Sequence, residues 1–401
     1  MKTSEPLAPS ADQSTKQAES PFVQLARSPL VPERVLKRYG AYCAIDTRFR
    51  SAARLLQCLW LKRQGVAMAP PEGRDPSTGN RAFGSILSVN DAAAGKNFLS
   101  PAIHQLALRE FLLREEDAAI DEERLMGNAL SSMPLAFNLF GPLALDLKLA
   151  TAVFRQILPD FVQTVERILF EHSPARRDDS FLADRTAFDV AVLLITPEGK
   201  RATIFIEVKY SESLEGPIAR PRDRYEEAAE EVQLYRNPAS AMLRSLAIEQ
   251  FWREHMLAQL IVDRELTSKA VFMAIGPRLN RRVQAAFRAY EAELLHEDSA
   301  EDRVEFVPLT LESIIQAIAS AGAIELATTL WERYCDFHRV YRLAVEELAT
   351  PPASAQSEAA PSGGTPANPT AASARRALPP ARRRSTGAAR EDLHTTSREA
   401  I

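Results

Sequence analysis

Hydrophobic residues along the chain recur with two alternating periods, which predict strands and helices in turn. Short apolar runs rich in β-branched and aromatic residues predict five strands, at residues 165–172, 187–195, 201–210, 269–276 and 303–311. Segments in which apolar residues recur about every 3.6 positions predict helices before, between and after these runs. Strands that alternate with helices are typical of an α/β layer architecture.

The predicted helices fill most of the remaining central part of the chain. They lie within residues 22–65, 98–121, 147–158, 223–237, 239–261, 278–295 and from 312 to about 348. Ser100 is a suitable N-cap for the second of them, with Pro101 at the first helical position. The apolar segment 130–145 contains two prolines and a glycine, so we expect these residues to break it.

Two of the predicted strands form a hairpin whose turn fixes the register. The loop 197–199 fits a three-residue turn, with Pro197 in its first position and Gly199 in the left-handed conformation. Thr196 then pairs with Lys200. One face of the hairpin becomes wholly apolar and should pack on a helix layer; its pairs are Leu194–Ala202, Val192–Ile204, Val190–Ile206 and Phe188–Val208.

The other face of the hairpin brings charged side chains together. The same register places Asp189 across from Glu207, with Cβ atoms about 5 Å apart, and Lys209 beside them. Two facing carboxylates repel each other unless a cation lies between them or an ammonium neutralises them. The arrangement therefore predicts either a divalent-metal site or a structural group of three ions on the sheet.

Composition narrows the class of protein without giving its function. The chain has 401 residues, 46% hydrophobic and 25% charged, with a formal net charge of −4, so any DNA-binding surface must be local. Three scattered cysteines without a CxxC motif argue against a disulfide framework or a zinc site. The N-terminus lacks the apolar core of a signal peptide, and no run of about 18 apolar residues occurs. We therefore expect no membrane span and a cytoplasmic location.

Composition also divides the chain into four parts. Residues 1–21 are polar, and residues 350–401 are rich in proline, alanine, serine and arginine, so both ends should be disordered. The arginines of residues 350–401 make this segment either a solvated tail or a loose electrostatic contact to nucleic acid. The pattern of residues 22–98 predicts a helical extension and a loop. This part would be either an element that sets substrate specificity or a packing extension. Residues 99–349 contain the predicted strands.

The hairpin pattern Asp189-x17-Glu207-x-Lys209 resembles the core of the PD-(D/E)xK nucleases, with Phe in place of the Pro before the Asp. Further segments resemble the restriction-endonuclease-like bacterial subgroup of that superfamily, over roughly residues 80–345; they are 130–143, 184–192, 206–212 and 233–238. The resemblance implies a mixed central β-sheet flanked by helices within residues 99–349. It also implies hydrolysis of phosphodiester bonds in DNA.

The resemblance further implies a metal ion and a set of residues that hold it. Mg²⁺, with Mn²⁺ as a substitute, would bind the carboxylates of Asp189 and Glu207 and the backbone carbonyl of Val208, since it prefers hard oxygen ligands. The ion would polarise the scissile phosphate and lower the pKa of a bound water. Lys209 would position or deprotonate that water, or stabilise the growing negative charge. Glu110, on the helix before the sheet, is the further acid expected as a ligand; its competitors are Glu115 and Glu116.

Other residues near the hairpin are weaker candidates. Gln233 is carried over as a catalytic residue from the Gln-x3-Tyr motif of RecB-like relatives, although its spacing to Tyr235 is Gln-x-Tyr here. His172 is interpreted as a surface histidine, with a general base as the alternative. Arginines on the two loops beside the site could contact DNA phosphates or simply be solvated; they are Arg176, Arg177, Arg185, Arg220, Arg222 and Arg224, with a further basic stretch at 278–282.

Three classes of function are compatible with these patterns. The first is a Mg²⁺-dependent DNA endonuclease of restriction type, for which a homodimer would supply the two active sites that cut both strands. The second is a DNA-binding or assembly module that kept the fold without activity, although it would have no reason to keep facing carboxylates. The third is another α/β enzyme, such as a phosphatase, but no Gly-rich phosphate loop or GxSxG motif is present.

Overall fold

The computed structural model describes most of the chain between its two ends. The described residues are 22–66, 84–116, 118, 120–174, 176–212, 214, 222–295 and 303–350. The predictions of disorder for residues 1–21 and for the segment after Thr350 lie outside them, and so does Arg220.

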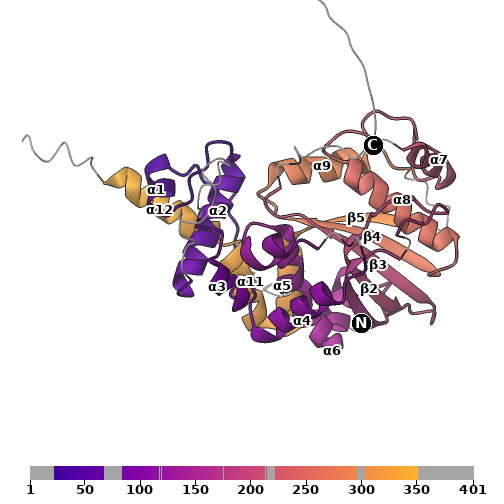
Figure 1. Cartoon of the computed structure of the whole chain (residues 1–401), viewed down its shortest axis with the longest axis horizontal. Coiled ribbons are helices and arrows are strands. Elements are labelled where there is room, and N and C mark those ends of the chain that lie inside the picture. Colours follow the sequence, from indigo (N-terminus) through magenta and orange to yellow (C-terminus); the bar gives the residue numbers. More distant parts are fainter. Residues whose placement is uncertain are drawn as a thin grey trace, which may run out of the picture. The chain divides into compact units, whose positions relative to one another are not determined.

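A mixed five-stranded sheet lies at the centre of the described structure (Figure 1). Its strands are β1 (Thr164–His172), β2 (Phe188–Ile195), β3 (Arg201–Val208), β4 (Lys269–Gly276) and β5 (Glu305–Thr310). They follow one another in chain order across the sheet, with β1, β2 and β3 antiparallel and β4 and β5 parallel to β3. The predicted strands and the mixed α/β architecture are therefore confirmed.

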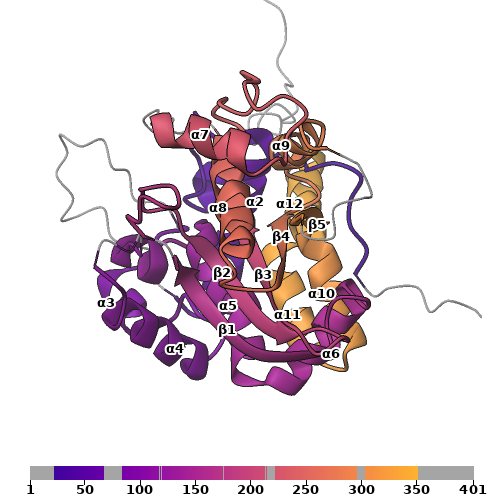
Figure 2. The same ribbon diagram turned by 90° about the vertical axis from the view of Figure 1, so that its right-hand side faces the viewer.

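Helices cover both faces of this sheet (Figures 1 and 2). Those before β1 are α1 (Glu33–Arg38), α2 (Arg48–Arg63), α3 (Val89–Ala93), α4 (Pro101–Leu112), the π-helix η2 (Glu123–Gly127), α5 (Ser132–Leu145) and α6 (Leu147–Ile157). Those after β3 are α7 (Asp223–Glu231), α8 (Glu249–Asp263), α9 (Arg281–Glu291), α10 (Leu311–Ser320), α11 (Ile324–Tyr334) and α12 (Phe337–Ala349). The Ser100 hydroxyl accepts a hydrogen bond from the Ile103 N–H, which confirms the predicted N-cap of α4.

Each face of the sheet buries its own apolar layer. Side chains such as Val192, Ile204 and Val208 pack with α5, α6 and α10 on one face, as the hairpin register predicted. Phe205 and Phe272 pack with α7, α8 and α9 on the other. Phe188 also lies in this second layer, where its ring stacks on Phe205 at 4.2 Å between centroids. Its predicted place opposite Val208 is wrong, because the β2–β3 ladder ends before Phe188 and no longer imposes strict alternation.

The apolar segment before β1 forms one continuous helix, α5, so the prediction that it is broken was wrong. Pro134 lies in the first turn, where a missing N–H costs no helix hydrogen bond. Gly141 lies close to α4: a Cβ atom there would be 3.1 Å from Ile103. Pro142 remains inside the helix, and most of α5 is buried against its neighbours, so tertiary packing outweighs the local cost of this proline.

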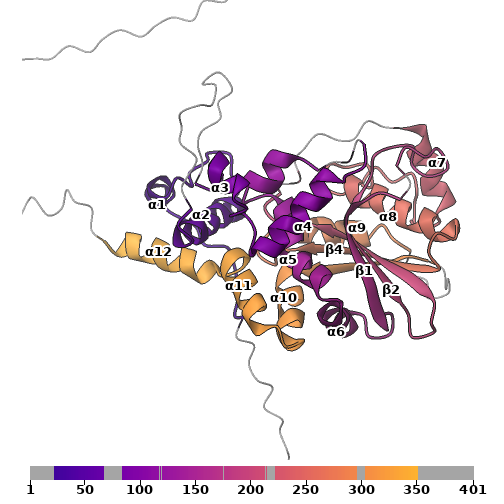
Figure 3. The ribbon, with the colours of Figure 1, turned by 60° about the horizontal axis from the view of Figure 1, so that its bottom comes forward.

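The helices nearest the N-terminus share a core with the rest of the described chain. Helices α1 and α2 pack beside α11 and α12 (Figure 3). The side chain of Gln57 on α2 donates hydrogen bonds to the Tyr210 hydroxyl, at 3.0 Å, and to the Arg333 carbonyl, at 2.8 Å. Because Tyr210 directly follows Lys209, the N-terminal helices are joined to the end of β3.

The described residues contain no single helix that is long and apolar enough to cross a bilayer, although α5 and α6 pass that test as a pair bent by 114°. Cys43, Cys58 and Cys335 are free thiols.

Candidate active site

Glu207 and Lys209 form a buried ion pair at the carboxyl end of β3. Their side chains are only 4% and 7% exposed, and the Lys209 Nζ lies 2.5 Å from Glu207 Oε1. The Lys209 N–H donates to the carbonyl of Ile275 on β4, at 2.7 Å, which continues the parallel ladder past the end of β3. The neighbouring strand therefore fixes the backbone of this pair.

The hairpin register that places Asp189 is confirmed by the structure. Backbone pairs run from Ile195–Arg201 to Val190–Ile206, and Gly199 has a φ of 77° in the turn. The ladder ends at the Val190–Ile206 pair, and Asp189 is the next residue of β2 beyond it. Its Oδ2 accepts a hydrogen bond from the Val208 N–H, at 2.8 Å, so its carboxylate takes the place of a backbone acceptor.

A third carboxylate, that of Glu171, lies on the other side of Asp189. Phe170 and His172 of β1 pair with Val190 and Phe188, so Glu171 stands across from Asp189. Its φ of 48° is in the left-handed region, which is strained for a residue other than glycine. Adjacent strands β1, β2 and β3 therefore each contribute one carboxylate to a single row. Glu171 was not among the residues predicted from the sequence.

The electrostatics of this carboxylate row reflect burial and crowding. Burial raises the pKa of Glu171 to about 7, with a further increase from Glu207 and decreases from Arg124 and Arg176. Burial, followed by the charges of Glu207 and Glu171, raises the pKa of Asp189 well above its usual range. Negative charge here is therefore costly without a compensating cation.

Helix α8 supplies two further polar side chains, Gln250 and Glu254. The Gln250 amide donates to Glu207 at 2.8 Å and to Glu254 at 2.7 Å, while its oxygen accepts from Lys209 Nζ at 2.6 Å. Glu254 Oε2 is buried and has no hydrogen-bond partner among the described residues. Burial, followed by the charge of Glu207, raises the pKa of Glu254 well above its usual range. Both residues were missed, although their i, i+4 spacing places them on one helix face.

The glutamine predicted for this position, Gln233, lies elsewhere. It is two residues past the end of α7, exposed, with a φ of 50°. The predicted helix 223–237 ends at Glu231, and α8 begins only at Glu249. The glutamine that contacts Lys209 in the structure is Gln250, on α8.

Glu110 lines a small cavity beside the carboxylate row. Its side chain is 25% exposed and pairs with Arg109 at 2.6 Å. The cavity, of about 150 Å³, is also lined by Glu171, His172 and Arg176. After burial, the carboxylates that raise the pKa of Asp189 are those of Glu207 and Glu171. Of the competing acids, Glu115 lines the same cavity and pairs with Arg176 at 3.2 Å, and Glu116 is exposed.

His172 is half-buried, and burial lowers its pKa, so its ring is neutral near pH 7. Its Glu115 and Arg176 neighbours act on this pKa in opposite directions. The interpretation as a surface histidine is therefore only partly right: the ring lines the small cavity.

The arginines predicted to contact phosphates have varied surroundings. Arg222 donates to the Ala183 carbonyl, and Arg224 donates to the Phe181 carbonyl, at 2.5 Å, and to Glu231, at 2.8 Å. These two arginines fasten α7 to the loop that precedes β2. Arg177 and Arg185 lie exposed on that same loop, and the Arg176 side chain is 8% exposed.

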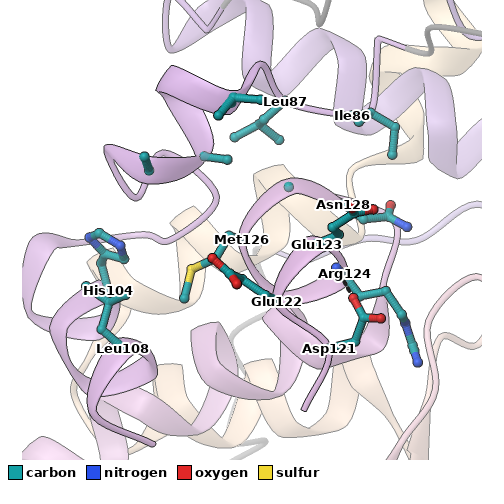
Figure 4. Close-up of a pocket in the computed structure, with 14 residues that line it drawn as sticks. Ile86, Leu87, His104, Leu108, Asp121, Glu122, Glu123, Arg124, Met126 and Asn128 are labelled. Carbon is teal, nitrogen blue, oxygen red and sulfur yellow. Dashed lines mark hydrogen bonds between the residues drawn. The ribbon is translucent and has the colours of Figure 1, made fainter. Parts of the chain in front are cut away.

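A larger cavity, of about 860 Å³, lies between α3, α4 and η2 (Figure 4). Ile86, Leu87 and Met126 contribute apolar walls, and His104 borders it from α4. The His104 Nε2 is buried without a hydrogen-bond partner among the described residues, and burial lowers the pKa of the ring. Arg124 links this cavity to the carboxylate row, because its charge also lowers the pKa of Glu171.

Comparison with known families agrees with this geometry. A family model described as the PD-(D/E)XK nuclease superfamily matches residues 44–336. The chain belongs to this superfamily. Curated proteins and solved structures give no match. The PD-(D/E)XK match begins just before α2 and ends after α11, so it includes the N-terminal helix α2 together with the whole sheet.

Members of the PD-(D/E)XK superfamily generally use divalent metal ions, and the carboxylate row of this member fits one. The Lys209 ammonium lies at the Glu207 end of the row, and a divalent cation would relieve the repulsion that, together with burial, raises the pKa of Asp189. No group of three His, Cys, Asp or Glu side chains in the described part of the chain has the geometry of a metal site. Mg²⁺ commonly binds proteins through only one or two carboxylates, with water and substrate phosphate completing its shell.

Proposed function

We propose that this PD-(D/E)XK protein is a Mg²⁺-dependent DNA endonuclease of restriction type that acts in the cytoplasm. The observation that carries the proposal is the row of carboxylates from Glu171 through Asp189 to Glu207, with the Lys209 ammonium held against its end. This arrangement lies at the end of β3, in a chain whose family hydrolyses phosphodiester bonds. Asp189, Glu207 and the Val208 carbonyl would hold the ion, with Mn²⁺ able to replace Mg²⁺.

The role of Lys209 follows from its surroundings. Burial alone would lower its pKa, but the charges of Glu207, Glu254, Glu212 and Asp189 outweigh burial and raise it. In this arrangement Lys209 is a hydrogen-bond donor and a positive charge. It would orient the attacking water or stabilise the additional negative charge on the phosphate oxygens in the transition state.

The remaining residues position these groups. When bound, Mg²⁺ would supply positive charge beside the scissile phosphate and favour ionisation of the attacking water. The attacking water gives up a proton to the solvent and its oxygen forms a bond to phosphorus, while the bond to the leaving oxygen breaks and that oxygen takes up a proton from the solvent. Gln250 holds the Lys209 Nζ and the Glu207 carboxylate in one arrangement, because its amide contacts both.

The proposal is tested by incubating the wild-type protein with a panel of DNA forms. Circular duplex, single-stranded and branched DNA, each with and without base methylation, are incubated with Mg²⁺, with Mn²⁺ and with EDTA. We expect nicked or linear products from at least one form with either metal and none with EDTA. Binding without cleavage of every form would instead support an inactive DNA-binding or assembly module.

Replacing Gln250 by leucine should reduce cleavage about tenfold while leaving DNA affinity unchanged. The leucine removes the acceptor that holds Lys209 and the donor that holds Glu207, so the ammonium is no longer fixed. Single-turnover cleavage and DNA binding in EDTA measure the two effects. Gln233→Leu is the matched control, and an equal loss in both variants would show that Gln250 has no positioning role.

A further inference from the structure

A second cavity, of about 350 Å³, lies near the carboxyl end of β3 and is lined by basic residues. Three segments that are far apart in the sequence form its walls: residues 27–28, 47–49 and 279–282. Four of its described lining residues are arginines, namely Arg27, Arg48, Arg281 and Arg282. None of the described lining residues is an aspartate or a glutamate. We call it the arginine cavity.

The arginines of this cavity include several that have no acidic partner. Within the described residues, the side chains of Arg27, Arg48 and Arg281 make no ion pair or hydrogen bond, and all three are exposed. Neighbouring arginines behave differently, since Arg50 and Arg54 both pair with Asp46. Positive charge therefore accumulates at this one place on a protein whose formal net charge is −4.

The backbone adds to this positive charge. Helix α2, of 16 residues, begins at Arg48, and α9, of 11 residues, begins at Arg281, so two helix N-termini border the arginine cavity. The N–H groups of Arg48 and Phe49 donate no hydrogen bond within the described structure, although Phe49 is 5% exposed. Guanidinium groups together with unpaired N–H groups match an anion with several acceptor oxygens, and phosphate is the common one.

The arginine cavity is joined to the same strand end as the carboxylate row. Asn280 donates a hydrogen bond to the carbonyl of Tyr210, at 3.0 Å, and Tyr210 directly follows Lys209. Phe49 packs edge-on against the Tyr210 ring, with centroids 6.4 Å apart. The arginine cavity and the carboxylate row therefore both lie at the carboxyl end of β3.

We propose that the arginine cavity binds a phosphate group of the nucleic acid at a point away from the bond that is cut. This inference rests on the proposed nuclease function and extends it. It gives the N-terminal residues 27–49 a part in holding the substrate. The phosphate recognised is either an internal phosphodiester or the terminal phosphate of a DNA end.

The test measures DNA binding in EDTA, so that no cleavage occurs. The variant Arg48→Ala/Arg281→Ala is compared with wild type and with Arg288→Ala, an exposed arginine farther along α9. Two DNAs are used: a closed dumbbell without ends and a linear duplex with 5′-phosphates. We expect the double variant to bind at least about tenfold more weakly, and the slope of log K against log salt to shrink by about 2. Arg288→Ala should stay within about twofold, as expected for a residue outside the cavity.

The outcomes separate the alternatives. If the double variant loses affinity for both DNAs, the cavity binds an internal phosphodiester. If it loses affinity only for the linear duplex, the cavity binds a terminal phosphate. Both results support the proposal. Unchanged affinity and salt slope, or no binding of either DNA, would overturn it. The variant Arg48→Lys/Arg281→Lys should keep the salt slope, and thermal unfolding confirms that each variant is folded. Because no cleavage is measured, arginine-dependent binding by a protein that cuts no DNA would reject the nuclease function and leave this site standing.

Discussion

Replacing Lys209 by methionine is expected to lower the rate of DNA cleavage by about 10²–10³-fold. Methionine has a similar length, but it removes the ammonium that contacts Glu207 and Gln250. DNA affinity in EDTA should change little, because the side chain is 7% exposed and held by protein groups. Single-turnover cleavage with Mg²⁺ and DNA binding without it measure the two quantities.

The control for this variant must separate catalysis from folding. Loss of the lysine leaves the Glu207 carboxylate buried without its partner, which costs about 3–5 kcal/mol of folding stability. Thermal unfolding must therefore show that Lys209→Met is folded at the assay temperature. Arg201→Met, at the exposed start of the same strand, should cleave like wild type. A folded Lys209→Met protein with normal cleavage would remove Lys209 from the mechanism.

Replacing Asp189 by asparagine is expected to abolish cleavage and, without metal, to stabilise the fold. Burial and the charges of Glu207 and Glu171 raise the pKa of Asp189, so its folded pKa lies above its unfolded value. Such a carboxyl favours the folded state at low pH, and this contribution is lost as the pH rises through the folded pKa. The asparagine stays neutral, and its oxygen can still accept from the Val208 N–H.

The expected Tm of Asp189→Asn in EDTA at pH 8 is higher than that of wild type by roughly 2–4 °C, which corresponds to about 1 kcal/mol. The difference should shrink as the pH falls, because the raised pKa of the wild-type carboxyl favours the folded state at low pH. Adding Mg²⁺ should raise the Tm of wild type but not of the variant. Asp160→Asn, at an exposed position, is the control. A lower Tm for Asp189→Asn at pH 8 would show that Asp189 is not under charge repulsion.

The part of the site that could be predicted from sequence is the part fixed by local chemistry. The turn with Pro197 and Gly199 sets the register of β2 on β3, and this register alone brings Asp189 toward Glu207 and Lys209. Each of the five strands was also visible, because buried runs of β-branched and aromatic residues are short and bounded by polar segments.

The residues that sequence did not reveal depend on contacts without a local signal. Glu171 faces Asp189 only through the register of β1 on β2, and no short turn between these strands fixes that register. Gln250 reaches Lys209 because of how α8 crosses the sheet, which helical periodicity does not specify. Arg48 and Arg281 line one cavity although they are far apart in the sequence, which neither segment could show by itself.

The account is tested most directly by the cleavage of one circular DNA by wild type and by Asp189→Asn in parallel. Both proteins are brought to the same concentration and shown to be folded, and the appearance of nicked and linear DNA is followed in Mg²⁺ and in EDTA. The account predicts products from wild type in Mg²⁺ only, and none from the variant in either condition. Equal cleavage by both proteins, or cleavage by wild type that continues in EDTA, would contradict it.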